Sequence, residues 1–385
     1  MNFQWKTVII PYILVLKIVG YWPKQTCYKA NFYSFYAVTF GVIFIGGHNL
    51  SQIIYTFHIR KDLKKLTVGL YMTSTNLLAV VKIYSFVRNV GIIKQLLFKM
   101  EEYEFGPKTR QQVRLLQKSL NFWKIVSFLY SIAMYSVVFS FSVLPLFTNN
   151  WRKTRLLPFR VWFPFSTRKM TRYVFVYIYQ VISAWYIAIV TLNIDLVMFT
   201  LMMFVWNQCE ILCDNLRYLE DDKFFVEKFI ECVKHHKAIV SFAKNSNRLS
   251  NNIVLGQMIT SVVVVSLAMF QLTQVHFISC EAFTSLLHIT ASLLQTLFYC
   301  WCGNEVEIKS SQISYAIYES KWVDQHEAVK KMMLIFGCRC QNPIILNAIQ
   351  LFPLCLKTFI TIVRSAWSYF VLLRNAGSYD VSAGL

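Results

Sequence analysis

Five side chains near the end of the sequence recur at intervals of three and four residues. They are Thr358, Thr361, Ser365, Ser368 and Leu372, and on a helix they fall within about 80° of arc. Hydroxyl oxygens can replace part of the hydration shell of an ion, and a narrow ring of apolar side chains excludes water. The stripe therefore predicts a pore-lining helix with Leu372 as a hydrophobic gate and Asn375 just beyond it. Small hydroxyl residues also allow close packing between membrane helices, and the spacing alone does not choose between these two roles.

Other reactive residues form no catalytic or metal-binding pattern. The seven histidines contain no H-E-x-x-H motif, and the sequence has no G-x-S-x-G motif and no glycine-rich phosphate loop. The cysteine pairs Cys300/Cys302 and Cys338/Cys340 have no structural zinc spacing. His235 and His236 are expected on a solvated helix face. We therefore expect no enzyme activity, no cofactor and no metal.

The segments that would form a binding site for a small molecule carry no charge. Four long stretches lack Asp, Glu, Lys and Arg but contain many aromatic residues: 69–81, 125–147, 173–194 and 253–279. Such a lining suits a neutral, mostly apolar ligand. The packed core of a helical bundle has the same composition, so this interpretation has a structural alternative.

The composition places these segments in a membrane. Of the 385 residues, 56% are hydrophobic and only 15% are charged, whereas an ordinary soluble domain has about 25% charged residues. The aromatic content excludes a disordered chain. The formal net charge of +20 lies mainly in the connections between apolar runs, which favours contact with a membrane surface over binding to nucleic acid.

The apolar runs predict an all-α membrane protein with seven transmembrane helices. We expect an interfacial helix within 1–30, spans 1–4 within 31–206 with an outer loop at 148–171, a cytosolic helical connection at 207–250, spans 5 and 6 within 251–303, a cytosolic anchor helix at 304–341, a pore-lining span within 342–375, and an extracellular tail at 376–385.

The distribution of Lys and Arg favours a cytosolic N-terminus and an extracellular C-terminus. Lys82, Asp195 and Lys357 come near the cytosolic interface on this topology, and snorkelling suffices to explain them. Arg364 lies near mid-membrane, where a charge is expected to face the interior of the bundle.

Four groups of residues resemble a known family. The segment PLCLKTFITIVRSAWSYFVLLR, which ends at Arg374, is similar to the C-terminal signature of insect odorant receptors. Further similarities are the run KIVGYWP at 17–23, then Leu157, Pro158, Trp162 and Pro164, and finally Tyr299, Cys300, Gly303, Ser310, Ala316, Tyr318 and Trp322. These groups have the order and topology of the family.

The resemblance implies an odorant-tuning subunit of a heterotetrameric ligand-gated, non-selective cation channel in the plasma membrane of olfactory sensory neurons. Its implied partners are a coreceptor, monovalent and divalent cations, the lipid bilayer and a neutral volatile. Leu372 matches the hydrophobic gate of the family. The family pocket lies in the outer halves of spans 2–5, which by position corresponds to Tyr71, Met72, Thr75, Tyr135, Phe139, Tyr177, Gln180, Val181, Met269, Phe270 and Thr273.

Two other membrane receptors are the alternatives. The related gustatory receptors end their last span with a Thr-Tyr pair and Gln-Phe, which this sequence lacks. A G-protein-coupled receptor would have an extracellular N-terminus, but no Asp-Arg-Tyr follows span 3. A secondary transporter ranks third, because the two halves show no similarity.

Overall fold

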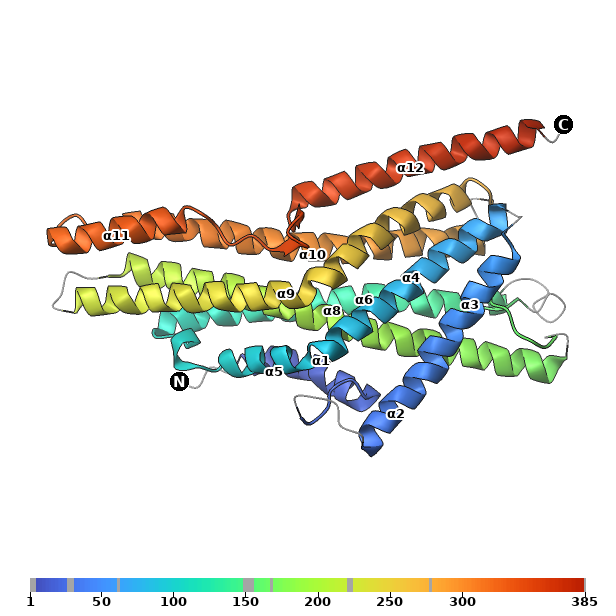
Figure 1. Cartoon of the computed structure of the whole chain (residues 1–385), viewed down its shortest axis with the longest axis horizontal. Coiled ribbons are helices and arrows are strands. Elements are labelled where there is room, and N and C mark those ends of the chain that lie inside the picture. The colour runs from blue at the N-terminus through green and yellow to red at the C-terminus, as the bar shows by residue number, and fades with distance from the viewer. Residues whose placement is uncertain are drawn as a thin grey trace.

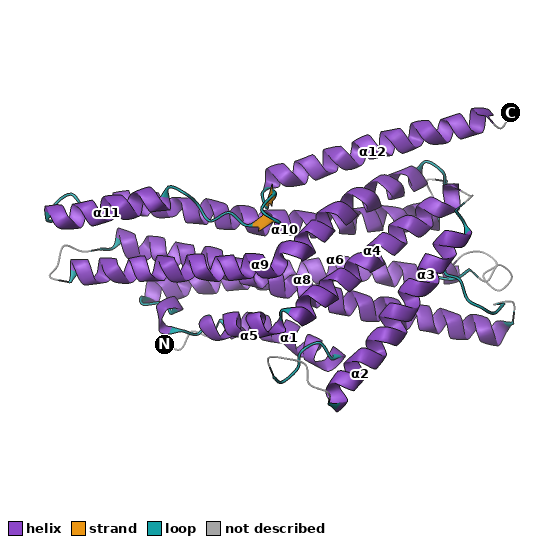
Figure 2. Ribbon diagram, viewed as in Figure 1, coloured by secondary structure: helices purple, strands orange, loops and turns teal. Residues whose placement is uncertain are grey.

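The computed structural model is almost entirely helical (Figure 2), and it describes residues 5–25, 31–60, 63–147, 156–166, 169–219, 224–276 and 279–383. Side chains are described at these positions except at 63–65, 147 and 376–383. The elements are α1 (Lys6–Val19), α2 (Phe32–Phe40), the π-helix η1 (Gly41–Gly46), α3 (Gly47–His58), α4 (Leu63–Arg88), α5 (Val90–Lys99), the 3₁₀-helix η2 (Tyr103–Phe105), α6 (Arg110–Phe147), α8 (Met170–Arg217), α9 (Phe225–Leu272), α10 (Cys280–Glu319), α11 (Glu327–Cys340), β1 (Asn347–Ala348), β2 (Phe352–Pro353) and α12 (Leu356–Ala383).

Seven helices in the described ranges are long and apolar enough to cross a membrane, which confirms the predicted number. They comprise Phe32–His58, Leu66–Arg88, Arg110–Leu146, Met170–Arg217, Phe225–Leu272, Cys280–Glu319 and Leu356–Asn375. α8 and α9 each have 48 residues, about 70 Å at 1.5 Å per residue, whereas the hydrocarbon core is about 30 Å thick. Both helices must therefore continue well beyond the bilayer.

The polar segments begin and end at different residues in the structure than the sequence predicted. The charged segment predicted as one anchor helix at 304–341 is split between the end of α10 and the separate helix α11. The predicted tail at 376–385 is helical as far as Ala383, because α12 runs on without a break.

α8 forms the centre of the bundle. Its side chains from Val190 to Gln208 are almost all buried, as expected for a helix that is apolar on every side. α6, α9 and α10 pack around it, and α1 lies against it. This central position explains why α8 contributes to most of the polar contacts described below.

The prediction for His235 and His236 is wrong. Both side chains are buried, and His235 Nε2 lies 2.9 Å from Gln208 Oε1 on α8. The part of α9 beyond the membrane packs against α8 instead of facing solvent, so its polar residues can be partnered by another helix.

α12 lies along one side of the bundle, at the upper edge of the view in Figure 1, where it packs against α9 and α10. It follows the antiparallel hairpin of β1 and β2. Asn247 and Asn251 of α9 accept hydrogen bonds from the backbone amides of Asn347 and Ile349. The start of α12 is therefore fixed to α9 through this hairpin.

Candidate ligand site and pore helix

A cavity of about 170 Å³ lies between α4, α6, α8, α9 and α10, and we call it the inner chamber. Its lining combines aliphatic and aromatic side chains with hydroxyl, amide and imidazole groups. An apolar cavity of about 150 Å³ in another protein is large enough to bind benzene. The inner chamber can therefore hold a small organic molecule.

Phe159 and His48 line this chamber and contact each other. The two rings meet edge to face with centroids 5.4 Å apart, and Phe159 also stacks on Phe141 at 5.6 Å. The backbone amide of Phe159 donates to Gln180 Oε1 at 3.0 Å. Tyr173 donates its hydroxyl to the Leu156 carbonyl oxygen at 2.9 Å. The loop segment 156–166 is thus held over the chamber by side chains of α8.

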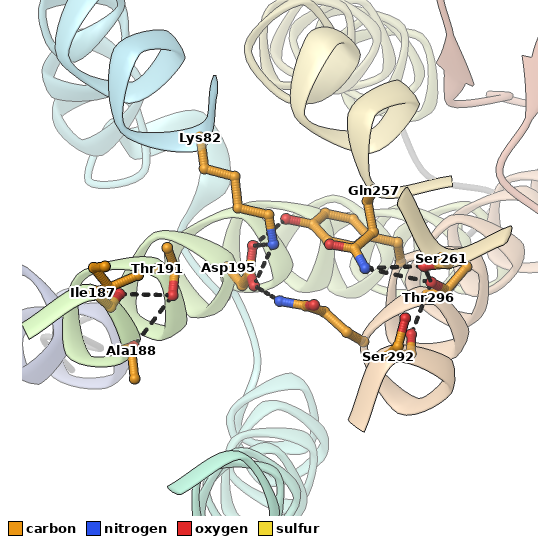
Figure 3. A network of polar contacts seen from close by, with 11 residues as sticks. Lys82, Ile187, Ala188, Thr191, Asp195, Gln257, Ser261, Ser292 and Thr296 are labelled. Carbon is orange, nitrogen blue, oxygen red and sulfur yellow. Dashed lines mark hydrogen bonds and ion pairs between the residues drawn. The ribbon is translucent and has the colours of Figure 1, made fainter. Parts of the chain in front are cut away.

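A buried ion pair joins Lys82, which lines the chamber, to Asp195 (Figure 3). Lys82 Nζ is 2.8 and 2.9 Å from the two carboxylate oxygens of Asp195, and both side chains are at most 1% exposed. The same carboxylate accepts from the Tyr299 hydroxyl at 2.6 Å and from Gln295 Nε2 at 2.5 Å. Snorkelling at the interface is therefore the wrong account of Lys82 and Asp195, because the two charges neutralise each other inside the bundle and connect α4, α8 and α10.

A second set of hydrogen bonds joins α9 to α10 beside the chamber (Figure 3). Gln257 Nε2 donates to Ser261 Oγ at 3.1 Å, and Ser261 Oγ lies 2.5 Å from Thr296 Oγ1. Thr296 in turn donates to the Ser292 carbonyl oxygen at 3.0 Å. These bonds hold the polar wall of the chamber in one arrangement.

A second cavity of about 330 Å³, which we call the outer chamber, adjoins the first. Residues 156–161 form one wall, and the ends of α4, α6, α9 and α10 form the rest together with Tyr55 of α3. Arg160 of the loop and Glu281 of α10 form an ion pair at 3.4 Å in which both side chains are substantially exposed. The outer chamber therefore has a polar rim and a mostly apolar interior.

The structure gathers only some of the predicted ligand residues at these chambers. Met72 lines both chambers, Thr75 lines the inner one and Tyr71 lines the outer one. Gln180 holds the Phe159 amide, as described above. The other predicted ligand residues line neither chamber: Tyr135, Phe139, Tyr177, Val181, Met269, Phe270 and Thr273.

Individual contacts explain several of these placements. The Tyr177 hydroxyl donates a hydrogen bond to the Ser142 carbonyl oxygen at 2.5 Å, and the Tyr135 ring stacks on Trp185 with centroids 5.7 Å apart. Phe139 is 56% exposed on the outside of the bundle. Thr273 donates to the Phe270 carbonyl oxygen at 2.7 Å.

The predicted pore stripe lies on the less covered side of α12. The side of this helix that packs on the bundle carries Ile362, Ala366 and Phe370, all buried. The stripe lies roughly 120° round the helix axis from that side, at 100° per residue. Its hydroxyl residues Thr358, Thr361, Ser365 and Ser368 each donate to a backbone carbonyl oxygen four or five residues earlier.

Leu372 is 63% exposed, and Asn375 and Arg364 are also exposed. The bundle of one chain therefore covers the stripe only in part, at Thr358 and Ser365, and leaves Arg364 exposed, so Arg364 does not face the interior of this chain as expected.

Several residues at the chambers were not predicted from the sequence. His48 of α3 and His288 of α10 lie outside the four stretches that the sequence pointed to, and Phe159 comes from a loop. His288 Nε2 lies 3.2 Å from Thr75 Oγ1 and its ring packs against Tyr71. In the sequence, the signal that could have pointed to His48 and His288 is that each is an isolated histidine within an apolar run.

The chain is similar to proteins of one family. Residues 62–367 match the profile of the family described as 7tm odorant receptor. Odorant receptor 94a of Drosophila melanogaster is 22% identical over 331 residues, 83% of each chain. Odorant receptor Or1 of Anopheles gambiae is 22% identical over 401 residues, which cover 95% of this chain and 94% of that protein.

A solved structure has the same fold. The insect olfactory receptor OR5 from Machilis hrabei in complex with eugenol aligns with a TM-score of 0.86 at 18% identity, over 96% of this chain and 98% of that chain.

Proposed function

Because this chain belongs to the 7tm odorant receptor family, we propose that it is the odorant-binding subunit of a heterotetrameric, ligand-gated, non-selective cation channel. A neutral volatile would bind in the inner chamber and open a pore lined by α12. The N-terminus would lie in the cytosol and the C-terminus outside.

Family membership and the seven apolar helices identify a multi-pass membrane protein of sensory neurons. Like its relatives, it is a receptor and not an enzyme.

The observation that carries the proposal is the inner chamber of about 170 Å³ between the helices. Its size suits a ligand of about ten non-hydrogen atoms. At roughly −0.5 kcal/mol per atom, such a ligand gains about −5 to −6 kcal/mol, which corresponds to a dissociation constant of tens to hundreds of micromolar. Modest affinity is expected for a receptor that must release its ligand quickly. Met72 and Thr75 are proposed ligand contacts.

The electrostatics of the chamber favour a neutral ligand. Lys82 is the cationic side chain on its wall, but its charge is already neutralised by Asp195. A carboxylate or an ammonium ion would lose its hydration without gaining an unpaired counter-ion, at a cost of several kcal/mol. Esters, alcohols and ketones would not incur that cost.

The stripe on α12 supports the pore part of the proposal. A side of a transmembrane helix with four hydroxyl residues is poorly matched to lipid tails but suits a water-filled passage. Surrounding such a passage requires further subunits, which we propose to include the coreceptor. The surfaces of α10 and α11 beyond the membrane would hold the subunits together.

The Leu372 gate yields a direct test. Leu372→Ser should raise the basal current of the assembled channel, because a hydroxyl in place of an apolar ring element weakens exclusion of water. Whole-cell recording without odorant measures this leak. Phe370→Ser is the matched control, since Phe370 is only 7% exposed and its loss should cost about 3 kcal/mol of stability and reduce surface protein. An unchanged leak for Leu372→Ser at normal surface level would contradict the gate.

The proposed function as a whole can be tested by current recording in cells that express this chain alone, the coreceptor alone, or both. A panel of small esters and alcohols, with carboxylates and amines of matched shape, should give cation currents in the pair without added nucleotide. The neutral compounds should be effective at concentrations at least tenfold lower, since 1.4 kcal/mol corresponds to a factor of ten. Responses that disappear with a G-protein inhibitor, or a preference for charged ligands, would contradict the proposal.

A further inference from the structure

The inner and outer chambers share three lining residues, Met72, Phe141 and Phe159. Two of these belong to transmembrane helices, whereas Phe159 belongs to the loop segment 156–166. The two cavities are therefore neighbours along one path, and these side chains form the wall between them.

Phe159 is the residue of this wall that comes from a loop. Its side chain is half-buried, as is that of Met72, whereas Phe141 is buried, and it borders both cavities. A side chain that borders a void lacks the contacts on that side which would otherwise hold its rotamer. Its ring is held by stacking on Phe141 and by the edge contact with His48. The backbone hydrogen bond to Gln180 fixes the main chain, and the ring can still turn about it.

The surrounding loop is anchored on several helices. Trp162 N donates to the Ser51 carbonyl oxygen at 3.1 Å, and the Trp162 ring stacks on His58 at 5.8 Å. Arg160 pairs with Glu281 at the rim of the outer chamber. The loop is thus a fixed frame at the outer end of the bundle, and the Phe159 ring is the element between the two cavities.

We infer that the Phe159 ring separates the two chambers and must turn aside for a ligand to pass from the outer chamber into the inner one. We also infer that this ring sets the maximum length of ligand that the site accepts. A ligand that fits within about 170 Å³ lies entirely on the inner-chamber side of the ring. A longer ligand must place its tail in the outer chamber, where the Phe159 ring stands in its way. The outer chamber is then a second subsite for an apolar chain, with Leu156, Leu157 and Pro158 on its wall.

The first test measures access and needs no channel activity. The full-length chain carries Ser292→Cys as a reporter in the inner chamber and Cys280→Ser to remove the native thiol of the outer chamber. A charged, membrane-impermeant methanethiosulfonate is applied to intact cells, and the labelled fraction is followed over time. Adding Phe159→Ala should raise the labelling rate at position 292 about tenfold, whereas Phe159→Leu should give an intermediate rate.

Phe163→Ala is the matched control. Phe163 is a half-buried phenylalanine of the same loop that contacts Phe165 and Tyr179 and lines neither chamber. If Phe159→Ala leaves the labelling rate unchanged, or if Phe163→Ala raises it equally, the inference is overturned. Surface biotinylation of every variant normalises the rates.

The second test rests on the proposed function and uses ethyl esters of increasing chain length. Phe159→Ala should lower the half-maximal concentration of the long esters about tenfold relative to the short ones and should speed the decay of current after washout. Phe163→Ala should leave the length profile of the wild type. An unchanged length profile in Phe159→Ala would overturn the role in ligand length. If labelling accelerates but the wild type shows no odorant current with the coreceptor, the separation of the chambers by Phe159 stands and the proposed function fails.

Discussion

Lys82→Met should prevent most of the protein from reaching the cell surface. The substitution keeps the length of the side chain but leaves the Asp195 carboxylate buried without its counter-ion. Breaking a buried pair in this way typically costs about 3–5 kcal/mol, a large share of the 5–15 kcal/mol that stabilises an ordinary domain. Asp195→Asn should be similarly damaging, because it leaves the ammonium group of Lys82 unpaired.

The double variant separates charge from packing. Lys82→Met combined with Asp195→Asn removes both charges, and the Asn carbonyl oxygen can still accept from Tyr299 or Gln295. We therefore expect it to recover most of the surface level, since a buried pair can be replaced by uncharged groups at little cost. Surface biotinylation and the thermal unfolding midpoint in detergent measure both effects.

Arg217→Met is the control for loss of an ordinary ion pair. Arg217 and Glu319 form a pair at 2.5 Å whose side chains are 44% and 51% exposed, so its loss should cost about 0–1 kcal/mol. The explanation fails if Lys82→Met resembles Arg217→Met, or if the double variant is no better than either single one.

This ion pair also shows what the sequence could not reveal. Each charge lies within a long apolar helix, and the two are 113 residues apart. Periodicity describes one helix at a time, so Lys82 and Asp195 each suited an interface where a single long side chain can reach water. Only the packing of α4 against α8 brings the ammonium group to the carboxylate.

The spans were predictable because each produces its own signal. An apolar run of bilayer length is visible without knowledge of its neighbours, and all seven runs became helices. The 3-4-3-4 spacing on α12 was equally local. On the side opposite the stripe, the structure buries Ala366 and Phe370 but leaves Trp367 exposed.

The chamber depends on which helix faces converge, and these helices are apolar on most sides. The predicted pocket omitted α10, which supplies His288, Ser292 and Gln295, and it could not include a loop phenylalanine. Phe139 looked as suitable as Phe141, two residues later, yet only Phe141 points inward. A two-residue step turns a side chain by about 200° round a helix.

Gly303→Ala should disturb the placement of α12. A Cβ at this position of α10 would overlap the Cβ and the carbonyl oxygen of Leu354, and it would lie 3.1 Å from the Leu354 carbonyl carbon. These are largely backbone atoms, so no side-chain rotation can relieve the overlap. Leu354 is itself 1% exposed and donates its amide to the Leu346 carbonyl oxygen at 2.8 Å.

The neighbouring contacts leave Leu354 little freedom to retreat. Asn247 and Asn251 hold the preceding hairpin on α9, and α12 begins two residues after Leu354. An added methyl group must therefore push α10 away from the hairpin and tilt the start of α12. We expect a loss of about 3 kcal/mol, at the upper end of overpacking effects, together with loss of odorant-evoked current in the protein that still reaches the surface.

Gly337→Ala provides the opposite case on α11, because a Cβ there meets nothing within 4 Å. It should be neutral or stabilising by up to about 1 kcal/mol, since alanine favours a helix over glycine. The unfolding midpoint of the assembled receptor and its evoked current are measured for both variants. Equal behaviour of the two would mean that the contact at Leu354 does not position the pore helix, whereas loss of current in Gly303→Ala alone would link that single backbone approach to channel opening.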